Sequence, residues 1–166
     1  MVEQITIYGA PVLRELAEEI KNVGELVRNM LRDLAETMAE NSGIGLAAPQ
    51  VGIALRAAVI NTTGREEDLI CVVNPVIEAS SGKARIKEGC LSIPGIFENV
   101  KRPAFVRVRA MDIDGNERII EAGGMEARVL QHEIDHLDGI LFTDRIPVYR
   151  KIFICKALRR LKAGRK

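Results

Sequence analysis

Two histidines four positions apart are the residues of this chain best placed to do chemistry together. His132 and His136 are the only histidines in the 166-residue sequence, and Glu133 lies between them in an HExxH pattern. On a helix, residues four apart share one face, so both imidazoles can point at a single metal ion. Glu133 can then hydrogen-bond a water on that ion without being a ligand. The alternative is two ordinary helical histidines beside a salt-bridging glutamate.

A catalytic metal site of this kind needs a third protein ligand and leaves one position for water. The usual protease solutions are excluded, because there is no third histidine and no glutamate follows Glu133. The remaining candidates are Asp138, Asp144, Cys71, Cys90 and Cys155. Core packing is the expected role of Cys71, which lies in an apolar segment, and a structural role that of Cys155 in the last helical segment. Cys90 lies among glycine and polar residues, where both a metal ligand and a buried thiol are reasonable.

A stretch of small residues, 43–52, surrounds one polar amide, that of Gln50. It lacks the Gly-Lys-Ser/Thr of a phosphate-binding loop and the third glycine of a dinucleotide fingerprint. Its glycines permit close approach of the backbone to a neighbour. The stretch can therefore place Gln50 against a ligand, and a purely structural turn is the alternative.

Helices are predicted where apolar residues recur at helical spacing. Residues 24–40 and 148–162 show this spacing, and residues 11–20 begin with a proline suited to a first helical turn. The HExxH segment follows 126–131, which contains strong helix formers and no proline. In the last helix, Tyr149, Phe153, Ala157 and Leu161 recur every fourth residue, joined by Ile154 and Leu158. These helices must carry or support the candidate metal ligands.

Strands are predicted between the small-residue stretch and the HExxH helix. Residues 56–61 form one strand, and residues 69–77 form another that is interrupted at Pro75. Residues 104–113 alternate apolar and polar side chains, and Asp114-Gly115 makes a hairpin turn into 117–121. Gly123-Gly124 then ends the strand before the motif helix.

Length and composition predict one ordinary domain, residues 1–166, with a core of its own. An apolar fraction of 47% and a charged fraction of 28% are typical of soluble proteins, and no apolar run is long enough to span a bilayer. The N-terminus shows no targeting pattern, so a cytoplasmic location is expected. An odd number of cysteines favours reduced thiols.

The charge of the chain is uneven, although its net value is only +1. Nine basic residues and no acidic residue follow Asp144. This basic end is a candidate contact for an acidic partner, and a solvated helix face is the alternative.

Three segments taken together resemble the peptide deformylase family. The patterns GxGxAAxQ, EGCxS and QHExDH are matched by residues 43–50, 88–92 and 131–136, in that order. The resemblance covers nearly the whole chain. It implies an α+β fold in which antiparallel β-sheets surround a central helix that carries HExxH, with N-terminal helices and a C-terminal helix. It also implies that residues 1–166 form one catalytic domain.

The resemblance implies a hydrolase that removes the formyl group from the N-terminal methionine of newly synthesised proteins and releases formate. Cys90, His132 and His136 would bind one divalent metal ion, with hydroxide on that ion attacking the formyl carbon. Glu133 would act as general base and acid. Iron(II), Fe2+, is the expected metal, and Zn2+, Ni2+ or Co2+ can replace it. The ligands alone do not choose among these metals.

Substrate contacts also follow from the resemblance. The Gln50 amide and the Leu91 backbone N–H would stabilise the developing oxyanion. The groove and methionine pocket would be formed by Ile44, Gly45, Ile86, Met125, Arg128, Val129 and His132. Family members often have an apolar or smaller residue in place of Arg128 and leucine in place of Met125, so this pocket rim departs from the family pattern.

The remaining implications concern partners. The substrates would be N-formylmethionyl nascent polypeptides in the bacterial cytoplasm, and the basic C-terminal helix is a candidate contact with the ribosome. No membrane or DNA partner is expected. Glu88 and Gln131 are candidates for hydrogen bonds that orient the metal ligands, or for purely structural roles.

Two other functions remain open from the sequence. One is a Cys/His amidase with Cys90 as nucleophile and His132 as base. The other is a metal-binding module without catalytic activity, although a closed structural site needs no general base such as Glu133.

Overall fold

The fold is built from seven strands and three α-helices within residues 1–164, which are the residues that the computed structural model describes. The strands are β1 (Gly45–Ala47), β2 (Ala57–Ile60), β3 (Ile70–Ser81), β4 (Ala84–Cys90), β5 (Ile93–Arg102), β6 (Phe105–Met111) and β7 (Glu117–Gly123). The helices are α1 (Glu25–Glu40), α2 (Gly124–Leu137) and α3 (Val148–Lys162). No helix in this part of the chain is long and apolar enough to cross a membrane.

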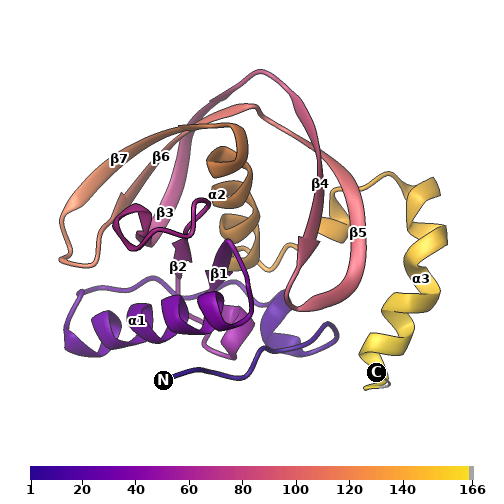
Figure 1. Ribbon diagram of the computed structural model, residues 1–166, viewed down its shortest axis with the longest axis horizontal. Helices are drawn as coiled ribbons and strands as arrows, with labels where there is room; N and C mark the ends of the chain where they lie inside the picture. The colour runs from indigo at the N-terminus through magenta and orange to yellow at the C-terminus, as the bar shows by residue number, and fades with distance from the viewer. Residues whose placement is uncertain (165–166) are drawn as a thin grey trace.

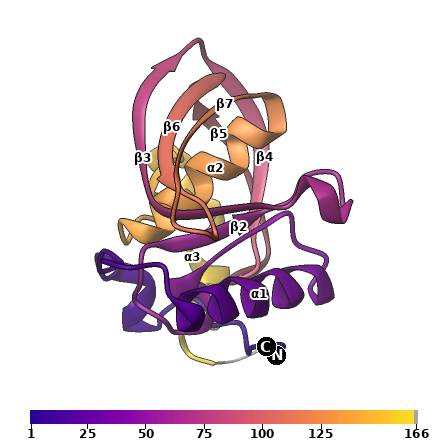
Figure 2. The same cartoon turned by 90° about the vertical axis from the view of Figure 1, so that its left-hand side faces the viewer.

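Two antiparallel sheets surround the central helix α2 (Figures 1 and 2). One sheet has five strands in the order β1-β2-β3-β6-β7, and the other is the β4-β5 ribbon. The α+β prediction, with HExxH on the central helix, is confirmed. Residues 127–137 of α2 are all buried, so the polar groups of the motif are held away from bulk water.

The packing of α2 against the five-stranded sheet fixes the direction in which the motif points. Val72 and Val108 of the sheet pack with Leu130 and Leu137 of α2, and all four are fully buried. Burying an aliphatic side chain of this size contributes about 1.5–3 kcal/mol. The opposite face of α2 is thereby turned toward the β4-β5 ribbon.

The predicted hairpin that leads into α2 is confirmed. β6 pairs with β7 in regular antiparallel register, from Phe105↔Gly123 to Met111↔Glu117. Between them the Asp112 side chain accepts hydrogen bonds from the backbone N–H groups of Asp114 and Asn116, each 2.9 Å long. The turn thus supplies its own polar partners and needs no tertiary support.

The predicted interruption at Pro75 is a bulge, and β3 continues beyond it to Ser81. Proline has no N–H for the ladder, and the register with β6 shifts between Val73 and Val76. Asn74 has φ 50° at this point. Its side chain exchanges two hydrogen bonds, of 2.8 and 2.9 Å, with the backbone of Ile20 and so anchors the N-terminal segment.

The prediction of a helix at residues 11–20 is wrong. Only a 3-10 turn forms, at Pro11–Arg14, and the chain then runs extended. The N–H of Ala17 donates to Leu137 O and the N–H of Glu18 donates to Ala54 O. A helix this short is marginal by itself, so these tertiary backbone partners decide the conformation. The prediction at 24–40 is confirmed by α1.

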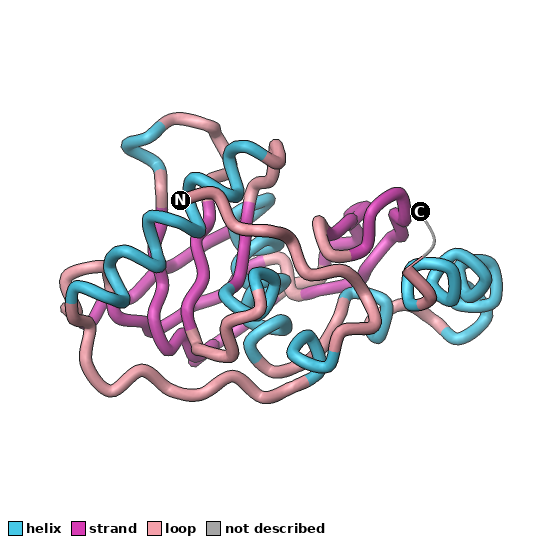
Figure 3. Tube along the Cα trace, turned by 90° about the horizontal axis from the view of Figure 1, so that it is seen from below, coloured by secondary structure: helices cyan, strands magenta, loops and turns pink. Residues whose placement is uncertain are grey.

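The last predicted helix is confirmed as α3, which lies at the edge of the molecule (Figure 3). Fewer apolar residues of α3 pack against the rest of the protein than the helical spacing predicts. Ile154 is buried and packs with Ala157 and Leu158 into a core beside β5, whereas Tyr149 and Phe153 are 61% and 75% exposed. The N-terminal turns of α3 therefore present apolar surface to solvent.

Candidate active site

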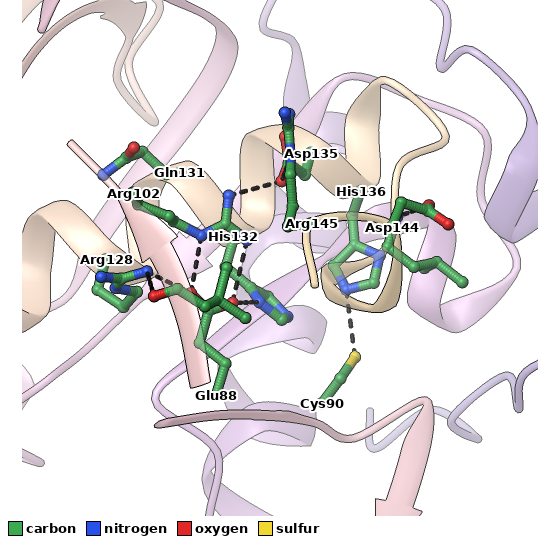
Figure 4. A network of polar contacts seen from close by, with 12 residues as sticks. Glu88, Cys90, Arg102, Arg128, Gln131, His132, Asp135, His136, Asp144 and Arg145 are labelled. Atoms are coloured by element: carbon green, nitrogen blue, oxygen red, sulfur yellow. Dashed lines mark hydrogen bonds and ion pairs between the residues drawn. The ribbon is translucent and has the colours of Figure 1, made fainter. Parts of the chain in front are cut away.

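Three possible metal ligands meet where the end of β4 approaches α2 (Figure 4). The ligand atoms of Cys90, His132 and His136 all lie within 4.8 Å of one another, and Cys90 Sγ is 3.2 Å from His136 Nε2. The histidines are one helical turn apart on α2, and Cys90 is the last residue of β4. The fold therefore brings together the two histidines and one of the candidate third ligands.

The other candidates for a third ligand are engaged elsewhere. Asp138 forms an ion pair of 2.6 Å with Arg56, and Asp144 pairs with Arg14. Cys71 packs in a separate core cluster, where burial raises the pKa of its thiol to about 11. The Cys155 thiol donates to a backbone carbonyl within α3.

The donor set fits a transition metal. Two imidazoles and a thiol suit zinc or iron(II) and not the oxygen-seeking Mg2+ or Ca2+. Glu133 Oε2 is buried and has no hydrogen-bond partner among residues 1–164, and Glu133 lines the cleft beside the cluster. Buried polar atoms normally have partners, so this oxygen indicates that the site accepts a further polar group, such as a water on an ion.

Glu133 is held against strand β1 by an unusually close approach. A Cβ atom on Gly45 would lie 2.4 Å from Glu133 Oε1 and 2.5 Å from Val129 Cγ1, so only glycine fits there. Glu133 is 3% exposed, and burial raises the pKa of its carboxyl to about 7. A carboxyl group in this range can both accept and return a proton near neutral pH.

Glu88 orients the first histidine of the motif. Its Oε2 lies 3.0 Å from His132 Nδ1, which leaves His132 Nε2 for the ligand cluster. Arg102 Nε and Arg128 Nη1 both donate to Glu88 Oε1 over 2.7 Å. Burial would raise the pKa of Glu88, but hydrogen bonds from His132 and Arg102 hold that pKa far below its usual range. Glu88 is therefore ionised at neutral pH.

The network of ion pairs around Glu88 extends along α2 to Asp135 and from there to Arg145 (Figure 4). Arg102 Nη1 donates to Asp135 Oδ2 over 2.6 Å, and Arg145 donates to both oxygens of Asp135. Arg102 is 5% exposed and thus joins two buried carboxylates from a strand of the ribbon. Gln131, by contrast, donates only to the backbone carbonyls of Pro103 and Ala127, which is a structural role.

The two histidines experience opposite electrostatic surroundings. Burial lowers the pKa of His136, and the charges of His132 and Arg102 lower it further. Burial acts in the same direction on His132, but contacts with Cys90 and Glu88 outweigh it and raise the pKa of His132. The ring of Phe142 stacks on His132 at an interplanar angle of 25°.

Gln50 has a fixed amide orientation. Its Oε1 accepts a hydrogen bond of 2.9 Å from the backbone N–H of Ala47. Its Nε2 is consequently turned toward the cluster and lies 3.4 Å from Cys90 Sγ and 3.3 Å from Ser92 Oγ. Gln50 is 2% exposed, so its N–H group acts in a dry environment.

A cleft of about 540 Å³ opens onto this cluster. Of the residues expected in the groove and methionine pocket, those that line the cleft are Ile44, Gly45, Met125, Arg128, Val129 and His132. Leu91 also lines it, directly after Cys90. Ile86 is not among the described residues that line the cleft. Arg128 is 3% exposed and its guanidinium forms an ion pair with Glu88. Arg128 therefore adds no uncompensated charge to the wall of the cleft.

Known proteins resemble this chain over nearly its full length. Residues 2–151 match the family model described as polypeptide deformylase. A protein named peptide deformylase from Syntrophobacter fumaroxidans is 46% identical over 161 residues, which cover 95% of each chain.

Solved structures agree with the sequence comparison. Peptide deformylase from Thermus thermophilus has a TM-score of 0.92 at 40% identity, over 98% of this chain and 99% of that one. The enzyme from Legionella pneumophila has a TM-score of 0.93 at 36% identity, over 100% and 99%. With the family match and the ligand cluster, these likenesses establish that the chain belongs to the polypeptide deformylase family of enzymes.

Proposed function

We propose that this peptide deformylase hydrolyses the N-formyl group of N-terminal methionine with one divalent metal ion held by Cys90, His132 and His136. The observation that carries the proposal is the meeting of these three ligand atoms within 4.8 Å, beside a cleft that is lined by Cys90, His132, Glu133 and Gln50. We also propose that residues 1–166 act as one catalytic domain.

A metal ion held by these residues would polarise a water molecule and lower the pKa of that water to about 7. The protein contributes the ligand geometry. Glu88 fixes the His132 ring, and the Glu88 carboxylate is in turn fixed by Arg102 and Arg128. Such supporting hydrogen bonds orient the ligands before substrate arrives, which avoids reorganisation during the reaction.

Gln50 and the backbone N–H of Leu91 are proposed to bind the formyl oxygen. As water adds to the formyl carbon, that oxygen becomes negatively charged. The Gln50 amide is already held in place by the Ala47 N–H, with its own N–H groups turned to the site. Preorganised donors of this kind stabilise the transition state more than the ground state.

Glu133 is proposed to carry the proton. It takes a proton from the attacking water and delivers it to the departing nitrogen when the carbon–nitrogen bond breaks. The products are formate and a free α-amine, so atoms and charge balance. The pKa of about 7 suits both halves of this transfer.

The substrate peptide is proposed to lie extended between two edge strands. β1 is the end strand of the five-stranded sheet, and β4 is paired only with β5. Residues 43–45 line one side of the cleft, and residues 89–91 line the opposite side. An edge strand offers free backbone groups to an added strand. The methionine side chain would enter the pocket near Met125 and Val129.

Replacing Gln50 by leucine should lower kcat about 10²-fold and change KM little, because the donor acts mainly on the transition-state oxyanion. Formate release from N-formyl-Met-Ala-Ser measures both constants. Ser92→Ala is the matched control, since it removes the other hydrogen-bond partner of Gln50 Nε2 and leaves the donor itself. A Gln50→Leu effect confined to KM would contradict the oxyanion role.

Iron(II) is proposed as the metal in cells, with zinc, nickel or cobalt as substitutes. A thiolate and two imidazoles are compatible with all four ions, so the preference follows from the family resemblance and not from the ligand set. Activity restored to metal-free protein by each ion, measured without oxygen, ranks them directly.

A bacterial cytoplasmic location and contact with the ribosome are proposed together, because the substrates are nascent chains. The exposed basic residues of α3 carry the ribosome proposal: Lys156, Arg159, Arg160 and Lys162. The family match ends at residue 151, so most of α3 lies beyond it. Two further basic residues, Arg165 and Lys166, lie outside the described part of the chain.

Changing Lys156, Arg159 and Arg160 to glutamine should weaken co-sedimentation with ribosomes. If each cation contacts a phosphate, the slope of log affinity against log salt should fall by about 2–3. Arg107→Gln with Arg109→Gln, on the exposed surface of β6, controls for lost charge. Equal co-sedimentation of the α3 variant and unmodified protein would reject the contact.

A cysteine-nucleophile amidase is the second candidate, favoured by the 3.2 Å contact between Cys90 Sγ and His136 Nε2. The expected base, His132, also contacts Cys90, so either histidine can take the proton of the thiol. The amidase and the metal-dependent hydrolase can be distinguished by trapping the reaction intermediate. Only the amidase forms a covalent formyl-cysteine. A mass increase of the protein during turnover would favour the amidase.

The direct test of the proposed reaction is formate release from N-formyl-Met-Ala-Ser by protein purified without oxygen. We expect the formyl peptide to give formate and a free α-amine, and the N-acetyl analogue, whose extra methyl group adds bulk at the reacting carbon, to give no free α-amine. Metal-loaded protein that releases no formate would reject the proposal.

A further inference from the structure

One exposed charge lies on the wall of the substrate cleft. Besides the candidate ligand Cys90, the charged or titratable residues that line the cleft are Lys87, Glu88, Arg128, His132 and Glu133. All of these five except Lys87 are buried. Glu88 and Arg128 also neutralise each other, so the cleft presents one solvent-accessible cation at its mouth.

The position of Lys87 is fixed by the strand and by an aromatic neighbour. Lys87 lies on β4 two residues before Gly89, and its Nζ is 5.4 Å from the ring centroid of Phe97 on β5. The Phe97 ring covers Gly89, where a Cβ atom would lie 2.5 Å from the ring. The ring is thus held on the cleft wall and keeps the ammonium group beside it.

The surroundings of Lys87 leave its charge uncompensated. No ion pair within residues 1–164 involves Lys87. On the same face of the ribbon, its cross-strand partner is Asn99, and the next pair is Arg85 with Lys101. All four side chains are exposed, and none is acidic. The face that borders the cleft therefore has a positive potential and no internal counter-charge.

We propose that Lys87 makes this cleft select formyl-methionyl chains with an acidic side chain at the second or third residue. The inference rests on the proposed function, because it assumes that the peptide leaves the reacting centre between β1 and β4. Side chains that follow methionine then pass the only exposed charge on the cleft wall. A lysine or arginine at the same position meets repulsion from Lys87, with Arg85 and Lys101 behind it.

The expected preference is modest and sensitive to salt. Exposed ion pairs shift an equilibrium by about two- to fivefold, and the Debye length of about 8 Å at physiological ionic strength leaves only close pairs effective. The preference should therefore be seen in kcat/KM at low salt and decline at high salt. An effect on the chemical step itself is not expected, because Lys87 is not among the ligands or the proton-transfer groups.

The test compares kcat/KM for peptides of the form formyl-Met-X-Z, with glutamate, glutamine or lysine at X or Z. Unmodified protein should favour glutamate over glutamine by about two- to fivefold at one of the two positions, and glutamine over lysine. Lys87→Glu should reverse this order, and Lys87→Met should abolish it. Lys101→Glu is the matched control, because it makes the same charge change on the same face but lies outside the cleft.

The outcomes separate this inference from the function on which it rests. No formate from the neutral peptide formyl-Met-Ala-Ser would reject the proposed function and, with it, the preference. Turnover of all peptides at equal kcat/KM would reject the preference alone. A reversal by Lys101→Glu as large as that by Lys87→Glu would also overturn the proposal, because the effect would then come from the general field of the ribbon.

Discussion

Glu133→Gln should lower kcat for formyl-peptide hydrolysis by about 10³-fold while the protein keeps its metal. Glutamine has nearly the same shape as glutamate and still fits against Gly45, but it cannot accept the proton of the attacking water. The residual rate should come from the oxyanion donors and from substrate positioning. Formate release and metal analysis on the same preparation measure the two quantities together.

Glu133→Asp is the matched variant, since it keeps the carboxyl group but shortens its reach. We expect it to recover part of the lost rate, because the group can still take a proton through a slightly longer path. A protein with Glu133→Gln that retains both metal and full kcat would show that proton transfer is performed by another group.

Arg102→Met should lower the free energy of unfolding by about 3–5 kcal/mol, because it leaves two buried carboxylates without their shared partner. Arg102 donates to Glu88 over 2.7 Å and to Asp135 over 2.6 Å, and it is 5% exposed. Methionine fills much of the same volume, so the loss reports the removed ion pairs, while Arg128 still contacts Glu88 and Arg145 still contacts Asp135. Urea unfolding in excess chelator measures this energy without a contribution from metal binding.

Arg107→Met provides the comparison for a surface ion pair. Arg107 contacts Glu78 and Glu121 on the exposed side of the five-stranded sheet, at distances of 3.4 and 2.8 Å. Its replacement should cost less than about 1 kcal/mol. If Arg102→Met and Arg107→Met lower the free energy of unfolding equally, then burial beneath the ribbon does not explain how much the Arg102 network stabilises the fold.

The sequence predicted the parts of the fold whose structure depends on local interactions. The helix that carries His132 and the hairpin at Asp114-Gly115 follow from spacing within a few residues. The segment 11–20 was mispredicted because its backbone partners, at Ala54 and Leu137, lie far away in the chain. Propensity within a short window cannot include such partners.

The β4-β5 ribbon and strand β1 were not predicted, for a different reason. The inward positions of the ribbon hold three buried charged residues, Glu88, Glu98 and Arg102, among apolar ones such as Val100, so the apolar alternation that marks a strand is interrupted. A strand that supplies charged partners to a metal site does not resemble a strand that supplies a hydrophobic core. Strand β1 has only three residues, too few for a period to be seen.

The residues proposed for the site were named from the sequence, and so was Glu88 as a residue that orients a ligand, but the arginines that hold Glu88 in place were not. Cys90 remained open as a ligand until its segment was compared with the family pattern, because spacing along the chain does not fix distance in space. The link from Glu88 through Arg102 to Asp135 required the tertiary structure, since these residues come from β4, β5 and α2. Arg128 lines the cleft as expected, and its guanidinium also supports Glu88.

The central claim is that hydrolysis depends on one metal ion at Cys90, His132 and His136, and a titration of metal into metal-free protein tests it most directly. Formate release from N-formyl-Met-Ala-Ser should rise in proportion to bound Fe2+ and stop rising when one ion is bound per chain. Cys90→Ala should show neither tight binding nor activity. Full turnover by protein from which all metal has been removed would contradict the account.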